Sequence, residues 1–388
     1  MSHPSRRDLL RAAPLAAAGP WLVGRAPAQP PVAPQNTTFN GMIVRMEDPL
    51  NLEMPFGSLT EWKVPTERFY VRSHFAVPKV DPAAYKLSVE GHVEAPFALS
   101  LDELKKLSPV TAPLTLECAG NDRVFLVPQV RGLQWSHGAV GNADWTGVPL
   151  AALLERARPK PGAVDVVLVG ADTGTVADPA TPGPINFDRS LPIGKATRPE
   201  VMVAYQMNGE DLTPGHGFPV RAVVGGWYGM ASAKWLTRVI VIDRPHAGFW
   251  QTLEYSYFDR RNGLPVVTPV GAVQPKAAIA RPGLNEVVPA GKPYTVFGAA
   301  WAGEAKVAKV EVSTDGGKSW NPAQVIGEAK PFCWITWRYE WKAPDAKGPA
   351  HLVARCTDEA GVTQPEQRDP HRRTYMINHL VPVEVLVR

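Results

Sequence analysis

Proline and glycine interrupt this chain at short intervals along its whole length, and no other feature constrains its fold as much. Forty prolines and 33 glycines are scattered through 388 residues rather than clustered. Both residue types break helices and punctuate turns. A chain of this length has room for two domains. The sequence therefore favours a two-domain fold that is rich in strands and loops.

After Pro275 the hydrophobic pattern becomes that of a β-sandwich. Strand-like runs are separated by Gly, Asp and Pro turns at the spacing typical of sandwiches, and they cover residues 307–313, 334–341, 351–357 and 381–387. The tripeptide Asp315-Gly316-Gly317 is typical of a hairpin turn in which glycine supplies a positive φ. We therefore predict an immunoglobulin-like sandwich over residues 273–388.

Upstream of the sandwich, strand and helix patterns alternate. Ser100 followed three residues later by Glu103 predicts a capped helix start, and a second short helix is expected to run to Ala157. Strands are expected at residues 69–72, 85–91, 165–170 and 235–242. The fold class is thus α+β, with a mixed domain over residues 66–272. The Pro- and Asn-rich residues 29–65 show little periodicity and are expected to form an extended arm over the surface.

Residues 1–28 are typical of an export signal. A charged start with Arg6 and Arg7 precedes a short Ala/Leu-rich segment and the A-x-A site Ala26-Pro27-Ala28. Paired arginines before leucines resemble the twin-arginine signal, which is an address and not an anchor, and the apolar stretch is too short for a membrane span. We expect a periplasmic protein that begins near Gln29 and carries a cofactor, because this export route carries folded proteins. The alternative is a tail with accidental arginines.

The charge balance gives no case for nucleic-acid binding. Lysine and arginine together number 41 against 37 acidic residues, a net charge of +4, and the basic residues form no local run. A small basic excess suits an anionic small molecule or an acidic partner.

The cysteines are too few for a disulfide scaffold. Cys118, Cys333 and Cys356 form no CxxC or CxxCH motif for zinc or covalent haem, and with no b5-like or flavin motif we expect no haem in this chain. Cys333 and Cys356 are expected on successive strands of a hairpin, roughly opposite each other. Two alternatives stay open: a disulfide, which the periplasm would allow, or two separate buried thiols.

The segment Leu116-Glu117-Cys118-Ala119-Gly120-Asn121-Asp122-Arg123 has the composition of a ligand-binding loop. Cys118 follows an apolar strand and precedes small residues that let the backbone approach a ligand closely. Arg123 can lower the pKa of the thiol and hold an anion nearby. A lone cysteine is more often a small buried hydrophobe, so the loop is only suggestive until its surroundings are considered.

The run Cys118-Ala119-Gly120-Asn121 resembles the molybdenum-ligating segment of the sulfite oxidase family, in which one cysteine supplies the only protein sulfur on the metal. The same family's motifs match this chain at further places, in the same order. One match lies upstream of the cysteine loop, at residues 69–74, and the others lie downstream, at residues 131–135, 145–150, 216–221, 232–235, 249–255 and 337–341. The resemblance implies a molybdenum–molybdopterin cofactor with Cys118 as its metal ligand. Thiolate ligation suits such a soft centre.

The resemblance also implies which side chains bind the cofactor and which act on the substrate. The cofactor set is Tyr70, Val71, Arg72, Ser73, His74, Cys118, Asp172, His216, Arg221, Ser232, Ala233 and Lys234. Its basic and hydroxyl members offer donors for a phosphate, and Asp172 would accept from the pterin. The catalytic set is Cys118, Tyr255, Arg72, His74, Arg123, Trp135, Arg338 and Arg131. Tyr257 is the alternative to Tyr255, and Trp135 would also be a core aromatic.

A ring of cations suits a small divalent oxyanion, because burying such an ion unpaired is prohibitively costly. The resemblance therefore implies oxidation of sulfite to sulfate. Since no haem or flavin motif accompanies the core, the electrons would leave to oxygen or, in the periplasm, to a separate cytochrome c or haem subunit. The sandwich resembles the family's dimerisation domain, so a homodimer is possible. Asp122 stands where vertebrate and plant relatives carry arginine, and it either weakens sulfite affinity or points outward.

Three other functions stay open. Within the family, the chain could be a dehydrogenase of another sulfur compound or an oxyanion reductase. The alternative outside enzymology is a secreted β-sandwich binding protein, which molybdenum analysis would distinguish.

Overall fold

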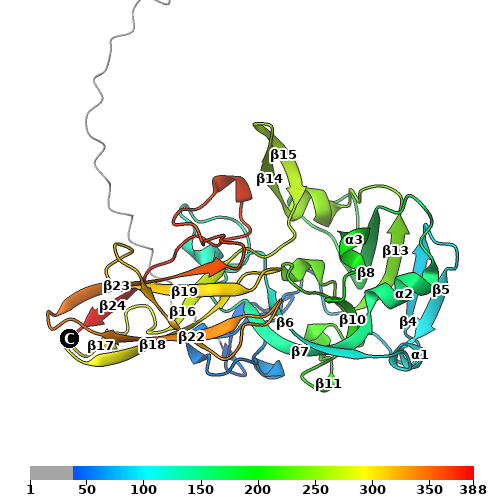
Figure 1. Cartoon of the computed structure of the whole chain (residues 1–388). Helices are drawn as coiled ribbons and strands as arrows, with labels where there is room; N and C mark the ends of the chain where they lie inside the picture. Colours follow the sequence, from blue (N-terminus) through cyan, green and yellow to red (C-terminus); the bar gives the residue numbers. More distant parts are fainter. Residues whose placement is uncertain (1–37) are drawn as a thin grey trace, which may run out of the picture. The chain divides into compact units, whose positions relative to one another are not determined.

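The computed structural model describes residues 38–388, and most of its regular structure is β-strand (Figure 1). The export signal predicted for residues 1–28 lies outside this range, as do the first residues of the predicted arm. No helix within residues 38–388 is long and apolar enough to cross a membrane. The α+β fold class is confirmed.

The described part of the predicted arm is only partly a surface segment. Strands β1 (Thr38–Phe39), β2 (Met42–Met46) and β3 (Asn51–Glu53) form a small antiparallel sheet. β3 is buried, and the backbone of Leu52 exchanges two hydrogen bonds of 2.9 Å with Val71. The Glu53 carboxylate accepts hydrogen bonds from the backbone N–H groups of Ser136 and Gly138. The arm expectation fails here because these polar groups pair with the following domain instead of with water.

Two five-stranded sheets build the domain that contains Cys118. In the first, β11 (Glu210–Asp211), β10 (Val201–Met207), β7 (Val140–Pro149) and β6 (Val110–Glu117) lie in that order, and β12 (Arg221–Val224) also pairs with β10. The second has the order β5 (Phe97–Ser100), β4 (Lys86–Gly91), β13 (Leu236–Ile242), β8 (Asp165–Gly174) and β9 (Ile185–Pro192). All pairs are antiparallel except β13 with β4.

The helices of this domain are short, as the spacing of proline and glycine predicts. They are α1 (Leu101–Lys105), α2 (Leu150–Ala157) and α3 (Ile193–Ala196). The capping box at Ser100 and Glu103 is present. Single 3-10 turns lie at Phe56–Ser58, Thr66–Arg68, Arg123–Phe125, Pro214–His216, Gly229–Ala231 and Pro370–Arg372, and a π turn lies at Trp250–Glu254.

One predicted strand is wrong. Residues 69–72 contain only an isolated bridge between Val71 and Leu52. Phe69 and Tyr70 are buried, as expected for a strand, but they line a cavity and do not pair in a sheet.

The C-terminal domain is the predicted immunoglobulin-like sandwich. One sheet has the order β16 (Lys276–Arg281), β18 (Pro293–Trp301), β22 (Ile335–Lys342) and β21 (Gln324–Ile326). The other has the order β17 (Val287–Val288), β24 (Val383–Val387), β23 (Gly348–Asp358), β19 (Val307–Ser313) and β20 (Asn321–Pro322). Between the two domains in sequence, β14 (Ser256–Arg261) and β15 (Leu264–Pro269) form a hairpin (Figure 1).

The hairpin expected to carry Cys333 and Cys356 is not formed. Cys333 precedes β22 and Cys356 lies in β23, and these strands belong to different sheets. The Cys333 thiol donates to Pro113 O at 3.0 Å, whereas Cys356 pairs in register with Val310. The two are separate buried thiols. The reason is topological, because consecutive strands of a sandwich often cross from one sheet to the other.

Candidate active site

Cys118 directly follows the end of β6, where the backbone turns away from the sheet. The ladder between β6 and β7 ends at Glu117 and Val140. The next N–H, that of Cys118, donates to Ala139 O at 2.9 Å, and Cys118 O accepts from Asn121 N at 2.9 Å. These bonds fix the loop that carries the thiol. The Cys118 side chain lines two cavities.

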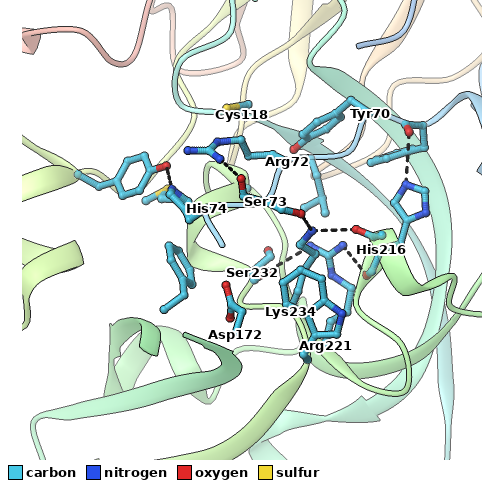
Figure 2. A pocket seen from close by; sticks show the side chains of 18 residues that line it. Tyr70, Arg72, Ser73, His74, Cys118, Asp172, His216, Arg221, Ser232 and Lys234 are labelled. Atoms are coloured by element: carbon cyan, nitrogen blue, oxygen red, sulfur yellow. Dashed lines mark hydrogen bonds between the residues drawn. The ribbon is translucent and has the colours of Figure 1, made fainter. Parts of the chain in front are cut away.

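The first cavity is shown in Figure 2 with the side chains that line it. Cys118 lies at one end of it, and Asp172, Arg221 and Lys234 lie toward the other. Segments far apart in the sequence meet here. The predicted residues whose side chains line it are Tyr70, Arg72, Ser73, His74, Cys118, Asp172, His216, Arg221, Ser232, Lys234 and Tyr255.

Fixed cationic donors occupy the end of this cavity remote from Cys118. Lys234 Nζ donates to Ser73 Oγ at 3.0 Å and to Gly215 O at 2.8 Å. Arg221 donates through Nη1 to His216 O and through Nη2 to Ser232 O. Burial lowers the pKa of Arg221 to about 10, and burial together with Arg221 lowers the pKa of Lys234 well below its ordinary value. Two buried basic side chains at the same end of one cavity favour an anionic ligand such as a phosphate.

Asp172, on β8, provides an acceptor with no partner in the protein. Its Oδ1 atom is buried and accepts no hydrogen bond from residues 38–388. Burial raises the pKa of Asp172 to about 6, although the nearby Lys234 opposes the rise. A buried acceptor without a donor is costly. The carboxylate therefore suits a ligand that brings its own N–H groups.

These residues fit a molybdopterin cofactor. Cys118 supplies a sulfur, Asp172 an acceptor for ring N–H groups, and the cationic end a place for the phosphate. Within residues 38–388 no three His, Cys, Asp or Glu side chains gather as metal ligands.

The second cavity is lined by arginines. It shares Arg72, Cys118 and Tyr255 with the first cavity, so these side chains form the wall between the two. The other guanidinium groups that line it belong to Arg123, Arg131 and Arg373. Arg131 is half exposed and forms ion pairs with Asp178 and Glu254.

Two glycines make room for the Arg123 guanidinium. A Cβ atom at Gly120 would lie 2.2 Å from Arg123 Nη2, and one at Gly132 would lie 2.7 Å from its Nη1. The group is also held by hydrogen bonds, from Nε to Thr374 Oγ1 at 3.1 Å and from Nη1 to Leu133 O at 2.8 Å. Gly120 of the cysteine loop and Gly132 therefore leave the space that the Arg123 guanidinium occupies.

The thiol of Cys118 feels both burial and these arginines. Burial raises the pKa of Cys118, while Arg72 and Arg123 act in the opposite direction. A bound metal would remove the remaining barrier to the thiolate, because a coordinated thiol is deprotonated outright.

Tyr255, rather than Tyr257, is the tyrosine of the site. Tyr255 lines both cavities, whereas Tyr257 lies on β14 of the hairpin. The turn that carries Tyr255 is held by Arg189, which is fully buried and donates to Trp250 O at 2.6 Å and to Val270 O at 2.9 Å.

The structure does not bring every predicted residue to the cavities. Arg338 is exposed on β22 and donates to Gln324 Oε1 at 2.9 Å, so its predicted role is corrected: it lines neither cavity. Trp135 is fully buried in the core and also lines neither. Val71 and Ala233 also line neither cavity; the backbone of Val71 pairs with Leu52, and Ala233 O accepts from Ala222 N.

Arg373 and Tyr375, which were not among the predicted site residues, line the second cavity. They come from the segment between β23 and β24, where Arg373 Nη1 donates to Ser256 Oγ at 2.9 Å. The Tyr375 ring lies 4.9 Å from the Tyr255 ring. The available signal was the basic pair Arg372-Arg373 beside an aromatic residue.

Asp122 faces away from the cavities. Its side chain is 2% exposed, with Oδ1 at 2.8 Å from His137 Nδ1 and Oδ2 at 2.9 Å from Lys276 Nζ. Of the two alternatives left open, the structure therefore favours a side chain turned away from the second cavity.

Comparison with known proteins gives matches to both domains. Residues 74–250 match the family model described as the oxidoreductase molybdopterin binding domain, and residues 269–385 match the Mo-co oxidoreductase dimerisation domain. Sulfite oxidase of Gallus gallus is 35% identical over 374 residues, which are 88% of this chain and 77% of that protein. Mitochondrial sulfite oxidase of Drosophila melanogaster is 33% identical over 347 residues, 82% of this chain. This chain spans only 58% of the length of the Drosophila protein.

A solved structure shares the fold over nearly the whole chain. The crystal structure of the sulfane dehydrogenase SoxCD from Paracoccus pantotrophus covers 99% of this chain and 97% of that chain, with a TM-score of 0.74 and 24% identity. The family models and the relatives confirm the resemblance to the sulfite oxidase family that the cysteine loop predicted. The chain belongs to the sulfite oxidase family of molybdopterin-dependent oxidoreductases.

Proposed function

We propose that this chain oxidises sulfite to sulfate and passes the electrons to a separate cytochrome c or haem subunit. The observation that carries the proposal is the arginine-lined cavity that meets the side chain of Cys118. A small divalent anion is stable in a partly buried site only where cations surround it. The names of the relatives from Gallus gallus and Drosophila melanogaster support the same substrate.

The first cavity would hold the cofactor. Cys118 would bind the metal, Asp172 would accept from the pterin, and the cationic end with Lys234 and Arg221 would bind its phosphate. When bound, the molybdenum cofactor supplies the two-electron oxygen-atom chemistry that the side chains of this protein lack.

The second cavity would bind and orient the anion. Arg72, Arg123 and Arg373 offer guanidinium groups that are fixed by the surrounding protein, so little reorganisation is needed when charge arrives. Tyr255 places its hydroxyl at the wall shared by the two cavities and can donate to an oxygen there. These groups would hold sulfite beside the Cys118 end of the first cavity.

The overall reaction balances with water as the source of oxygen. Sulfite and water give sulfate, two protons and two electrons. The electrons require an acceptor, and a one-electron haem protein would take them in two steps.

Localisation and assembly belong to the proposal as well. We propose that residues 1–28 direct export by the twin-arginine pathway and that the protein works in the periplasm. A homodimer through the sandwich is supported by the match of residues 269–385 to a dimerisation domain. Cell fractionation and size-exclusion chromatography with light scattering test the two statements.

The experiment that tests the reaction compares Cys118→Ser with Cys333→Ser. Cys333 is also a buried thiol, but it bonds to Pro113 O and lines neither cavity described above. After expression with molybdenum supply, the wild type and Cys333→Ser should each hold about one molybdenum atom per chain and reduce cytochrome c when sulfite is added. Cys118→Ser should lose the sulfite-dependent rate. Near wild-type turnover in Cys118→Ser would sink the proposal.

The same assay separates the alternatives. Thiosulfate and nitrate, the latter with a reduced dye, replace sulfite in parallel reactions. Turnover of either in preference to sulfite would identify a dehydrogenase of another sulfur compound or an oxyanion reductase. Protein without molybdenum after proper cofactor supply would favour the binding protein.

A further inference from the structure

A lysine of the sandwich is buried against the back of the cysteine loop. Lys276 is the first residue of β16 and its side chain is 1% exposed. Its Nζ atom lies 2.8 Å from Glu117 Oε1 and 2.9 Å from Asp122 Oδ2. Glu117 directly precedes Cys118, and Asp122 follows it by four residues. One ammonium group therefore ties both ends of the loop that carries the thiol.

The Glu117 end of the loop is fixed by further bonds. Trp301 Nε1, also from the sandwich, donates to Glu117 Oε2 at 2.8 Å. Asn121 Nδ2 donates to Glu117 Oε1 at 3.2 Å, while Asn121 Oδ1 accepts from Ala139 N. The carboxylate thus has partners on both oxygens, and it holds the residue next to Cys118 in one place.

The Asp122 end adopts a backbone conformation that requires support. Asp122 has a φ of 71°, in the left-handed region that residues other than glycine seldom adopt. Both carboxylate oxygens are paired, one with His137 and one with Lys276. Arg123 is the next residue, so the direction in which its side chain enters the anion cavity depends on this strained position.

We propose that Lys276 is a positioning residue for the anion-binding site. By pairing with Glu117 and Asp122, it sets the Cys118 thiol and the Arg123 guanidinium relative to each other. The sandwich domain is thereby part of the active site, although Lys276 itself contacts neither cavity. The kinetic part of this inference rests on the proposed sulfite oxidation, whereas its structural part does not.

Removal of Lys276 would leave two carboxylates buried without a cation. Unpaired buried charges are strongly destabilising, and the loop would move to expose them to water. Since a displacement of about 1 Å in a catalytic group can lower a rate about 100-fold, a loss of this size needs only a small shift of the loop.

A matched control exists in the same chain. Lys195 is also buried and also links the two domains, because its Nζ atom lies 2.7 Å from Glu200 Oε1 and 2.7 Å from Glu304 Oε1. It contacts neither the cysteine loop nor the two cavities. Lys195→Met should therefore reproduce the loss of an interdomain ion pair without moving Cys118 or Arg123.

The first measurement needs no substrate. In cofactor-free protein, the rate at which iodoacetamide alkylates Cys118 is followed by mass spectrometry of the peptide that contains it. Lys276→Met should raise this rate about tenfold relative to the wild type, because a loosened loop exposes the buried thiol. Lys195→Met should match the wild type. Equal alkylation rates in the two lysine variants would overturn the positioning role.

The second measurement separates positioning from stability in the cofactor-loaded enzyme. Lys276→Met should raise the KM for sulfite and lower kcat/KM by about 10- to 100-fold, while Lys195→Met should leave both unchanged at a temperature where both variants are folded.

Should Lys276→Met fail to fold, Asp122→Asn decides, because it keeps the pair between Lys276 and Glu117. Asp122→Asn should raise the KM for sulfite through Arg123, and an unchanged KM would overturn the inference. Altered alkylation in Lys276→Met without sulfite turnover in the wild type would refute the proposed reaction and leave the structural role standing.

Discussion

His74 Nε2 lies 2.6 Å from the phenol oxygen of Tyr255, at the wall shared by the two cavities. The imidazole is packed against the rings of Phe187 and Trp250. Burial, with Arg72 and Lys234, lowers the pKa of His74 well below its ordinary value. Burial raises the pKa of Tyr255 to about 12, although Arg72 opposes the rise. Both groups are therefore neutral at physiological pH, and the bond between them fixes the phenol without a charge.

This pairing predicts the effect of removing the phenol oxygen. Tyr255→Phe should lower kcat/KM for sulfite about 100-fold, the usual effect of losing one preorganised donor at a reacting oxygen. Tyr257→Phe is the control, because Tyr257 lies on the hairpin and outside both cavities. Steady-state kinetics of the two variants decide between them. If the control lost activity and Tyr255→Phe did not, the assignment of the tyrosine would be reversed.

The space around Arg123 gives a second prediction. In Gly120→Ala the new methyl group would lie 2.2 Å from Arg123 Nη2 unless the guanidinium moved. The displaced cation should raise the KM for sulfite about tenfold or more. Gly194→Ala is the control, because nothing lies within 4 Å of a Cβ atom at Gly194. A KM in Gly120→Ala equal to that of the control would show that Arg123 does not hold the anion.

Local patterns in the sequence predicted the parts of the site that are local. The cysteine loop, the segment from Tyr70 to His74 and the segment from Ser232 to Lys234 each lie together in the sequence and line the first cavity. The capping box at Ser100 and the strands of the sandwich are also local, because they depend on periodicity and turn residues.

The predictions that were wrong concern contacts between distant parts of the chain. The motif that contains Arg338 identifies a strand of the sandwich, but no local pattern shows which residue of that domain reaches the arginine-lined cavity. That residue is Arg373, which lies 250 residues beyond Arg123 in the sequence. The arrangement of Cys333 and Cys356 was wrong for a similar reason, since strand order in a sandwich is not set by the sequence of strands alone.

A buried histidine predicts how stability depends on pH. Burial lowers the pKa of His379 to about 4, and its Nδ1 atom has no hydrogen-bond partner within residues 38–388. Below pH 6.5 the unfolded chain binds a proton that the folded chain does not. The free energy of unfolding should therefore fall as the pH drops from 6.5 to 4, by up to about 1.4 kcal/mol per pH unit from this group.

Urea denaturation of cofactor-free protein between pH 4 and 7 measures this contribution. His379→Gln should show a smaller loss of stability toward acid than the wild type. The comparison cancels the effect of other groups, including Asp172, whose raised pKa acts in the opposite direction because the folded chain binds its proton first. Parallel curves for the two proteins would mean that folding does not lower the pKa of His379.

Arg373, and not Arg338, is expected to determine the affinity for sulfite. Arg373 lines the anion cavity and is held by backbone carbonyls of the turn before β14 and by Ser256 Oγ, so its charge is fixed beside Tyr255. Arg373→Gln removes a charge-assisted hydrogen-bond donor, which should raise the KM for sulfite about 10- to 100-fold. Arg338→Gln changes only an exposed pair with Gln324 and should leave KM and kcat at wild-type values. If Arg338→Gln raised the KM and Arg373→Gln did not, a different loop would reach the anion in the working enzyme, and the cavity described here would not be the sulfite site.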